Sequence, residues 1–585
     1  MLPNLMASSL KALNLKWRSS RWRSLGALGA IAAGYAHACA VAAPWNGQPV
    51  WWLQIMALAG LVALVQRAPS VKSAAAIGWL FAITWLAGST WWLFISMHTF
   101  GGLAAPLAAL AVLALSGFLA LYYAAACAFY KRVGALTQVN SAQAAIIFAA
   151  AWLLAELARD TWFTGFPWAA GGYAQVDGPV AASASVWGVY GVGCVASVAA
   201  VVLVMVLRAL WARKIKSWWA VAGLGAFACV VGATTLLGAV DAGSVWGFFT
   251  RTHLVELPNN VKIPRQEHVR RTSVALLQGN IPQGEKFDSS KGVPIALEWY
   301  AQQLAASTAT MVVAPETAIP VLPQQLPPEY WAALQTRFKT GEQAALIGVP
   351  LGDYETGYTN SVMGFSPQLP PQQGPQQGLQ QSLQQGAKNV MQPQPYRYDK
   401  HHLVPFGEFI PPLFKWFTRM MNIPLGNFNR GAVGQDSMEW AGQRWAPNIC
   451  YEDLFGNELA ARFTRGGTAP TVLVNMSNIG WFGNSIAIDQ HLHISRMRAI
   501  ELGRPMLRAT NTGPTVIIDH RGQVTHSLPR HTRGVLLGEV EGRSGITPYA
   551  WWAARFGLWP LWMLGFTILL GAAHPGFAGS KGPKR

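Results

Sequence analysis

The sequence predicts a polytopic α-helical membrane domain of eight spans that carries one large external α/β domain. Of its 585 residues, 52% are hydrophobic and only 12% are charged, whereas a soluble chain has about 25% charged residues. Long apolar runs fill residues 1–242 and recur near the C-terminus, but residues 243–551 alternate short strands with helices. We therefore expect a membrane domain with seven spans (1–242), an external domain (243–551), and an eighth span with a basic tail (552–585).

Eight apolar runs are long enough to cross a hydrocarbon core of about 30 Å, which takes about 20 helical residues. Their approximate ranges are 25–43, 49–66, 74–97, 102–130, 143–159, 186–208, 217–241 and 553–574. The first run follows several basic residues, as a signal peptide would, but the later spans favour a retained anchor. The Ala38-Cys39-Ala40 sequence leaves cleavage open as an alternative.

Lys and Arg residues mark one side of this arrangement. They gather in both terminal tails and in the loops after the second, fourth and sixth spans, whereas the short loops on the other side offer only Arg159. Because basic loops remain in the cytoplasm, we expect both termini there and the α/β domain outside. This asymmetry also accounts for much of the net charge of +18, so we expect no nucleic-acid partner.

The loop between the fifth and sixth spans is dense in aromatic residues, with Trp162-Phe163-Thr164-Gly165-Phe166-Pro167-Trp168. An aromatic belt at the membrane interface is one reading, and a lipid-entry groove beside the external domain is the other. Just before it, Glu156, Arg159 and Asp160 share one helix face, where they can pair with one another or receive a cationic substrate group.

The external domain reads as a sheet-forming α/β unit, because apolar strands alternate with helices. Strands are expected at 272–278, 311–316, 344–349, 359–365, 396–404, 438–450, 470–477 and 505–519, and helices at 293–308, 328–340, 454–463 and 485–502. Residues 366–395 are dominated by Gln, Pro and Gly, so we expect a disordered loop without chemistry of its own.

Cys450 is the only cysteine of the external domain, because the other four lie in predicted spans. It follows a strand and precedes a predicted helix, where a thiol can meet backbone N–H groups that bind an oxyanion. The alternative is a small buried hydrophobe. Since the domain offers no disulfide partner, an exported Cys450 is either buried or reactive.

Glu316 and Lys400 complete a candidate catalytic set. Glu316 ends a predicted strand and Lys400 lies in the predicted strand 396–404, and strand ends are where open α/β sheets build sites. A carboxylate can take the thiol proton and return it to another group. A thiolate attacks an acyl carbonyl to give a thioester, and an ammonium stabilises the oxyanion. For each residue taken alone there is a structural alternative. Glu316 is then a hydrogen-bonded carboxylate at a strand end, and Lys400 is a charge on the surface.

Several motifs resemble the nitrilase (carbon–nitrogen hydrolase) superfamily, and more closely its membrane branch, the apolipoprotein N-acyltransferases. They include Leu277-Gln278-Gly279-Asn280-Ile281-Pro282-Gln283, Ala314-Pro315-Glu316-Thr317-Ala318, Lys400-His401-His402-Leu403-Val404-Pro405-Phe406-Gly407-Glu408, Ile449-Cys450-Tyr451-Glu452, Trp481-Phe482-Gly483 and, in the membrane half, Gly165-Phe166-Pro167-Trp168. Phe287 departs from the pattern, because the family often has tryptophan there.

The resemblance implies a nitrilase-like α-β-β-α sandwich on the outer, periplasmic face of a bacterial inner membrane. It implies Glu316 as general base, Lys400 as oxyanion stabiliser and Cys450 as nucleophile. Three further residues match positions that the family needs for activity: Glu408, Tyr451 and Glu452. Glu408 is expected to hold Lys400 or Glu316, since a buried ammonium needs a carboxylate partner.

The reaction that the resemblance implies is acyl transfer from a membrane phospholipid to the α-amino group of a diacylated apolipoprotein, through a Cys450 thioester. We expect a monomer embedded in the bilayer, with no cofactor and no metal. The alternatives are a membrane-anchored amidase or nitrilase, in which water resolves the thioester, and a transporter with an external domain. Few intramembrane charges argue against the transporter.

An apolar segment at 411–425 favours the acyltransferase over the amidase, since an exposed apolar patch in an external loop marks lipid or partner contact. Core packing of this segment is the alternative. Its candidate lipid-contact residues are Phe414, Trp416, Phe417, Met420 and Met421.

Overall fold

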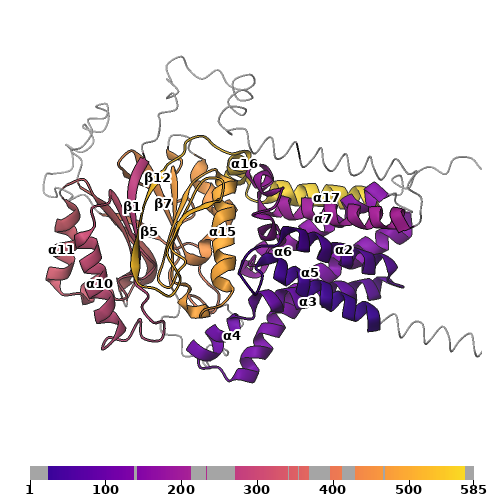
Figure 1. Cartoon of the computed structure of the whole chain (residues 1–585), viewed down its shortest axis with the longest axis horizontal. Helices are drawn as coiled ribbons and strands as arrows, with labels where there is room; N and C mark the ends of the chain where they lie inside the picture. Colours follow the sequence, from indigo (N-terminus) through magenta and orange to yellow (C-terminus); the bar gives the residue numbers. More distant parts are fainter. Residues whose placement is uncertain are drawn as a thin grey trace, which may run out of the picture.

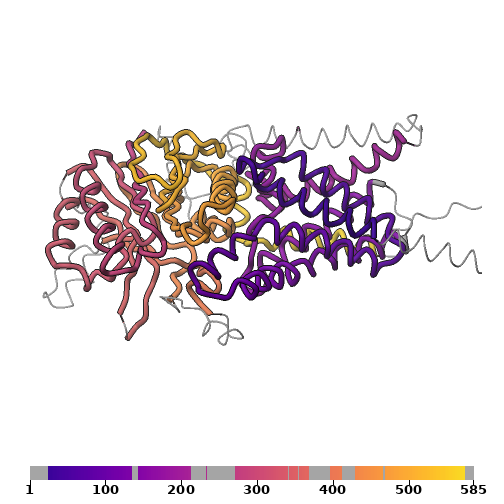
Figure 2. The backbone as a smooth tube through the Cα atoms, turned by 60° about the horizontal axis from the view of Figure 1, so that its bottom comes forward, coloured from indigo at the N-terminus to yellow at the C-terminus, as the bar shows by residue number. Residues whose placement is uncertain are grey.

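The computed structural model describes residues 24–137, 141–211, 232, 271–339, 341–353, 355–367, 395–410, 428–464 and 468–573. The helices of the membrane half lie together at one end of the molecule and the strands at the other (Figure 1). The turned view keeps the same two parts apart along the long axis (Figure 2).

The strands of the described residues form two six-stranded sheets. The first has the order β12-β1-β2-β3-β4-β5 and the second β11-β10-β9-β8-β7-β6. In the first sheet the bounds are β1 Arg271–Gln278, β2 Met311–Ala314, β3 Ala344–Asp353, β4 Gly357–Phe365, β5 Tyr396–Asp399 and β12 Gly534–Glu541. In the second they are β6 Met438–Trp440, β7 Gln443–Ile449, β8 Val472–Ser477, β9 Met506–Thr510, β10 Val516–Ile518 and β11 Val524–Ser527.

The two sheets pack face to face. Side chains alternate along each strand, so each sheet directs one set of side chains toward the other sheet and one set away from it. In β1, Val274 and Leu276 join a core with Ile449 and Val474 of the other sheet. Their neighbours Ala275 and Leu277 face the opposite way, into a second core. Each inner face is therefore apolar, and the sheets are held by apolar burial rather than by shared backbone hydrogen bonds.

Helices cover both outer faces, which gives the four-layer α-β-β-α arrangement that the resemblance implies (Figure 1). On the first sheet these are α10 (Gly292–Ala306) and α11 (Pro328–Lys339). On the second they are α14 (Gly456–Ala460), α15 (Ala487–Leu502) and α16 (Pro548–Phe556).

The membrane half supplies five helices, among the described residues, that are long and apolar enough to cross a membrane. Their ranges are Ser24–Val41, Val71–Thr90 (α3), Ala105–Gly134 within α5 (Ala105–Thr137), Ala142–Thr164 over α6 (Ser141–Thr161), and Ala181–Trp211 over α7 (Ala184–Trp211). The helix α2 (Trp51–Arg67) is apolar but shorter. The seventh expected span, 217–241, lies outside the described residues, so the count of eight remains a prediction.

The expected last span is not one straight helix over 553–574. Instead, α16 and α17 (Trp559–Ala573) meet at 89°. The turn falls at Gly557, whose φ of 55° ends α16 in a conformation that side chains disfavour, and Pro560 follows at once in the next helix. Most of the range predicted for the span is therefore the single helix α17.

Several strand and helix boundaries differ from the expectation. The predicted strand at 438–450 is a hairpin, because Ala441 and Gly442 both take positive φ values and turn the chain between β6 and β7. The strand at 396–404 stops at Asp399, since the N–H groups of His401 and His402 donate to Glu452 rather than to a strand.

Three further corrections concern the second half of the domain. The strand at 505–519 is divided into β9 and β10, which pair with each other in antiparallel fashion. The helix at 454–463 is the short α14 between two 3₁₀ turns. Sequence analysis missed β11, whose side chains are all exposed, and β12, of which Leu536 and Val540 reach the core between the sheets.

The helix α15 joins the two halves of the molecule, because it contacts both the second sheet and the membrane helix α7. The Gln490 side chain lies between Trp92 and Trp168, and both indole N–H groups donate to it, at 3.1 and 2.8 Å. Farther along the helix, Glu501 accepts from the backbone N–H of Val189 at 2.6 Å. Buried polar contacts therefore fix α15 on the membrane half.

Candidate active site

The strand ends of the two sheets bring the three predicted catalytic residues to one edge. Glu316 follows β2, Lys400 follows β5 and Cys450 follows β7. The strand β5 runs parallel to β2 because β4 pairs with both β3 and β5 in antiparallel fashion. All three residues are consequently delivered at carboxyl ends, as sequence reasoning predicted.

Lys400 lies between two carboxylates. Its Nζ donates to Oε1 of Glu408 at 2.8 Å and stands 3.5 Å from Oε1 of Glu316. Only 1% of the Lys400 side chain is exposed. Burial alone would lower the pKa of Lys400, but the charges of Glu408 and Glu316 raise it above its ordinary value. The ammonium is therefore a permanent buried positive charge.

Glu316 is held in place by two asparagines that sequence analysis did not identify. The side chain of Asn360 donates to Oε1 of Glu316 at 2.7 Å and to Oε1 of Glu408 at 2.8 Å. The backbone N–H of Asn478 donates to Oε2 of Glu316 at 2.7 Å. Charge-assisted bonds of this kind fix the orientation of a carboxylate.

Cys450 stands in a sharp turn between β7 and a 3₁₀ turn, Cys450–Leu454. Its φ of 51° lies in the left-handed region, which costs a residue with a side chain about 1–3 kcal/mol. Its carbonyl accepts from the Asn475 amide and lies within hydrogen-bond distance of the His491 ring, both at 3.2 Å. The surrounding contacts thus sustain a strained backbone at the thiol.

The electrostatic setting keeps the Cys450 thiol neutral at rest. Burial raises the pKa of the thiol above its ordinary range, the charge of Glu316 raises it further, and Lys400 opposes the rise. A neutral thiol is a poor nucleophile, so attack needs a base that removes the proton as the bond forms. Glu316 is one of two carboxylates at this edge of the sheets, and its charge acts directly on the thiol.

Of the supporting residues, Glu408 holds Lys400, whereas Tyr451 and Glu452 flank the turn. The Tyr451 hydroxyl donates to the carbonyl of Gly165 in the membrane half at 3.2 Å. The Glu452 carboxylate accepts from the N–H groups of Ile449 and His401, each at 2.6 Å. Glu452 therefore ties the start of the turn to the loop that follows β5.

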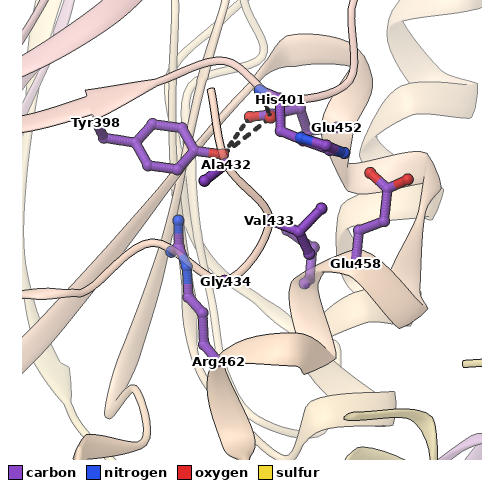
Figure 3. A pocket seen from close by; sticks show the side chains of 9 residues that line it. Tyr398, His401, Ala432, Val433, Gly434, Glu452, Glu458 and Arg462 are labelled. Carbon is purple, nitrogen blue, oxygen red and sulfur yellow. Dashed lines mark hydrogen bonds between the residues drawn. The ribbon is translucent and has the colours of Figure 1, made fainter. Parts of the chain in front are cut away.

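A small cavity of about 20 Å³ lies behind the turn, with room for a single water (Figure 3). In this view the Tyr398 hydroxyl points at the Glu452 carboxylate, to which it donates at 2.8 and 2.9 Å. Glu458 and Arg462 line the same cavity. The space is too small for an acyl substrate, so these residues support the turn instead.

The loop after β1 adds one buried cation that sequence analysis missed. Lys286 is 2% exposed, and its Nζ donates to the backbone carbonyl of Glu316 at 3.0 Å. Its only sequence signal was a lysine beside Phe287, which does not distinguish a buried ammonium from a surface one.

The aromatic loop of the membrane half has two different surroundings. Trp162 and Phe163 are exposed, which suits an interfacial belt, whereas Trp168 is buried against Gln490 of α15. Before the loop, Glu156 and Arg159 pair with each other at 3.1 Å, and Asp160 accepts from Tyr190 at 2.6 Å. These charges are partnered within the protein rather than open to a cationic substrate group.

Two expectations lie outside the described residues. One is the loop at 366–395, of which only the ends are described. The other is the apolar segment 411–425, with the candidate lipid-contact residues Phe414, Trp416, Phe417, Met420 and Met421.

Comparisons with known proteins match both halves of the chain. Residues 37–202 match the model of the apolipoprotein N-acyltransferase N-terminal domain, and residues 273–548 match that of carbon–nitrogen hydrolase. The second match identifies the two-sheet domain as a nitrilase-like carbon–nitrogen hydrolase fold. A crystal structure of a carbon–nitrogen hydrolase from Helicobacter pylori aligns with 51% of this chain and 95% of its own, at 14% identity and a TM-score of 0.32.

Two full-length relatives are much more similar. An apolipoprotein N-acyltransferase from Verminephrobacter eiseniae is 54% identical over 90% of this chain and 92% of its own. An enzyme of the same name from Ralstonia nicotianae is 42% identical over 89% of each chain. The similarity thus spans the membrane helices and the two-sheet domain together.

Proposed function

Because the chain belongs to the apolipoprotein N-acyltransferase family and is an inner-membrane enzyme that N-acylates lipoproteins, we propose that Cys450 carries the acyl group as a thioester between two half-reactions. The observation that carries this proposal is the buried arrangement at the strand ends. A neutral thiol, an oriented carboxylate and a fixed ammonium meet at one edge of the two sheets. These are the parts that acyl transfer through a thioester needs.

In the first half-reaction Sγ of Cys450 attacks the ester carbonyl of a membrane phospholipid while Glu316 takes the thiol proton. The carbonyl π electrons move to oxygen, and the Lys400 ammonium stabilises this oxyanion. When the oxyanion collapses, the C–O ester bond breaks and the glycerol oxygen takes the proton from Glu316. The products are an acyl-enzyme thioester and a lysophospholipid.

In the second half-reaction the α-amino group of the lipoprotein's terminal, diacylated cysteine attacks the thioester carbonyl. Glu316 accepts a proton from the amine, and Lys400 again faces the oxyanion. The C–S bond then breaks, an amide forms, and the proton passes from Glu316 to Sγ. Both substrates react at the same three side chains, so the lysophospholipid leaves before the lipoprotein binds.

The two-sheet domain works on the periplasmic face of the inner membrane, with both termini in the cytoplasm and the enzyme acting as a monomer. The distribution of Lys and Arg in the loops supports this orientation. The packing of α15 and the nucleophile turn on the membrane half supports it further, because acyl chains reach the site from the bilayer.

The test is to incubate the purified enzyme with labelled phospholipid and no lipoprotein. We expect an acyl adduct on the peptide that contains Cys450, detected by mass spectrometry, together with free lysophospholipid. Cys450→Ala should form no adduct and no triacylated lipoprotein while remaining folded, and Glu316→Gln should slow adduct formation by about 10²-fold or more. If no adduct appears until lipoprotein is added, the acyl group passes directly between bound substrates and the proposal is wrong.

A further inference from the structure

Lys286 is a buried cation next to Glu316 to which the proposed mechanism gives no role. Its loop, which follows β1, places Nζ 3.0 Å from the Glu316 carbonyl. The residue is 98% buried, which is rare for a lysine unless the charge has a partner. Yet no carboxylate within the described residues lies at ion-pair distance from this ammonium.

The charges of the site explain why a buried cation is useful there. Glu316 and Glu408 bring two negative charges, but Lys400 brings only one positive charge and lies closer to Glu408. Thiol deprotonation by Glu316 moves a negative charge to sulfur without changing the total. One unbalanced negative charge therefore stays in the Glu316–Cys450 couple throughout, and burial penalises it.

Lys286 is electrostatically coupled to both members of this couple. Burial lowers the pKa of Lys286 from 10.5 to about 7, and the charges of Glu316 and Cys450 act in the opposite direction. Beyond Glu316, the other charged groups coupled to Cys450 are Lys400, Glu408 and the buried pair of Asp453 and Arg508, whose opposite charges offset each other. Because coupled sites share their protons, a negative charge on the couple favours the Lys286 ammonium, and the ammonium favours the negative charge.

We propose that Lys286 is a positioning residue for the acyl transfer, in which its ammonium is the counter-charge of the Glu316–Cys450 couple and its hydrogen bond fixes the Glu316 backbone. This inference rests on the proposed thioester mechanism. Lys286 forms no bond with substrate. Its positive charge favours the state in which Glu316 and Cys450 together carry one negative charge, and in that state Glu316 can receive the thiol proton.

Three variants separate the charge from the hydrogen bond. Lys286→Gln keeps an N–H donor and removes the charge, and Lys286→Arg keeps the charge. Lys291→Gln removes an exposed lysine of the same loop and serves as the matched control. The readout is the pH dependence of Cys450 alkylation by iodoacetamide, measured in the folded enzyme by mass spectrometry of the Cys450 peptide.

We expect Lys286→Gln to be alkylated, and to form the thioester, about tenfold more slowly than the wild type at pH 6, where the wild-type Lys286 carries its charge. At pH 9, where the wild-type Lys286 is neutral, the two rates should be close. Lys286→Arg should keep the wild-type rate at pH 6, and Lys291→Gln should keep it at both pH values. Lys286→Gln should also unfold at a higher temperature than the wild type near pH 7, because it removes a buried ammonium. If Gln destabilises the fold, Lys286→Met provides the same comparison without the charge.

Alkylation of the neutral variants at the wild-type rate at pH 6 overturns the counter-charge role. So does a lower unfolding temperature with an unchanged pH profile, which would make Lys286 structural only. The outcome is independent of the thioester proposal: if wild-type enzyme forms no thioester, that mechanism fails, whereas the alkylation rates still report on Lys286.

Discussion

Glu452 shows how a single side chain positions the nucleophile. Its carboxylate accepts from the N–H of Ile449, just before Cys450, and from the N–H of His401 and the hydroxyl of Tyr398 at the end of β5. Burial raises the pKa of Glu452, and these donors oppose the rise. Because its oxygens are already engaged, Glu452 acts by fixing the turn and not by moving a proton.

Glu452→Gln tests this assignment. An amide places an NH₂ group against backbone donors, so we expect the free energy of unfolding to fall by about 2–3 kcal/mol. Thioester formation should fall in parallel, because the turn loses its anchor. Thermal unfolding in detergent and acylation rates are the measurements, with the exposed Glu439→Gln as control. Lost activity at wild-type stability would instead place Glu452 in the chemistry.

At this scale the sequence pointed to Glu316, Lys400 and Cys450, which the structure places at strand ends, but not to the side chains that hold them. Glu316 and Cys450 each follow an apolar strand, whereas Lys400 follows the mixed strand Tyr396–Asp399 and stood out through the resemblance. The donors that orient Glu316 are not, since the Asn478 contact joins positions 162 residues apart. Lys286 lies in a short polar loop, where local pattern says nothing about burial.

Among the elements, those with regular apolar spacing were predictable. The strands β1 to β4 and the helices α10, α11 and α15 fall where the apolar residues indicate. The predicted strands 438–450 and 396–404 were wrong in their bounds, because local backbone conformation and hydrogen bonding end the strands there. Ala441 adopts a positive φ that no propensity predicts, and Glu452 draws the N–H groups of His401 and His402 away from a strand.

The helix α7 contains a break of the same kind at Gly188, with φ 69° and ψ 177°. A Cβ on Gly188 would come within 2.4 Å of the Tyr549 ring in α16. We expect Gly188→Ala to lower the free energy of unfolding by about 2–3 kcal/mol, from strain and overpacking together.

Gly571→Ala is the matched control for Gly188→Ala. Gly571 lies in α17 with no positive φ and with open space where a Cβ would stand, so alanine there should be neutral or stabilising by up to about 1 kcal/mol. Thermal unfolding in one detergent compares the two variants. Equal stability of both would mean that α7 straightens at little cost.

For the whole molecule, the shared core between α15 and the membrane helices argues against an independent catalytic domain. Ile488, Ile494 and Met497 of α15 pack in one cluster with Val189 and Val192 of α7. A fragment of residues 271–546 would expose this apolar face to water.

We therefore expect the 271–546 fragment to aggregate, although the intact chain in detergent stays monodisperse. Sedimentation and size-exclusion chromatography measure this directly, and the intact chain purified alongside is the control. A soluble fragment with native-like thermal unfolding would show that the membrane half adds little to the stability of the two-sheet domain.

The bond from Tyr451 to Gly165 also has a mechanical consequence. Arg159, near the end of α6, grips the carbonyls of Phe166 and Trp168, and the adjoining Gly165 holds the residue next to the nucleophile. A span adjusts its tilt to the thickness of the surrounding lipid. Because these bonds join the end of α6 to the turn at Cys450, we expect a change in the tilt of α6 to shift that turn.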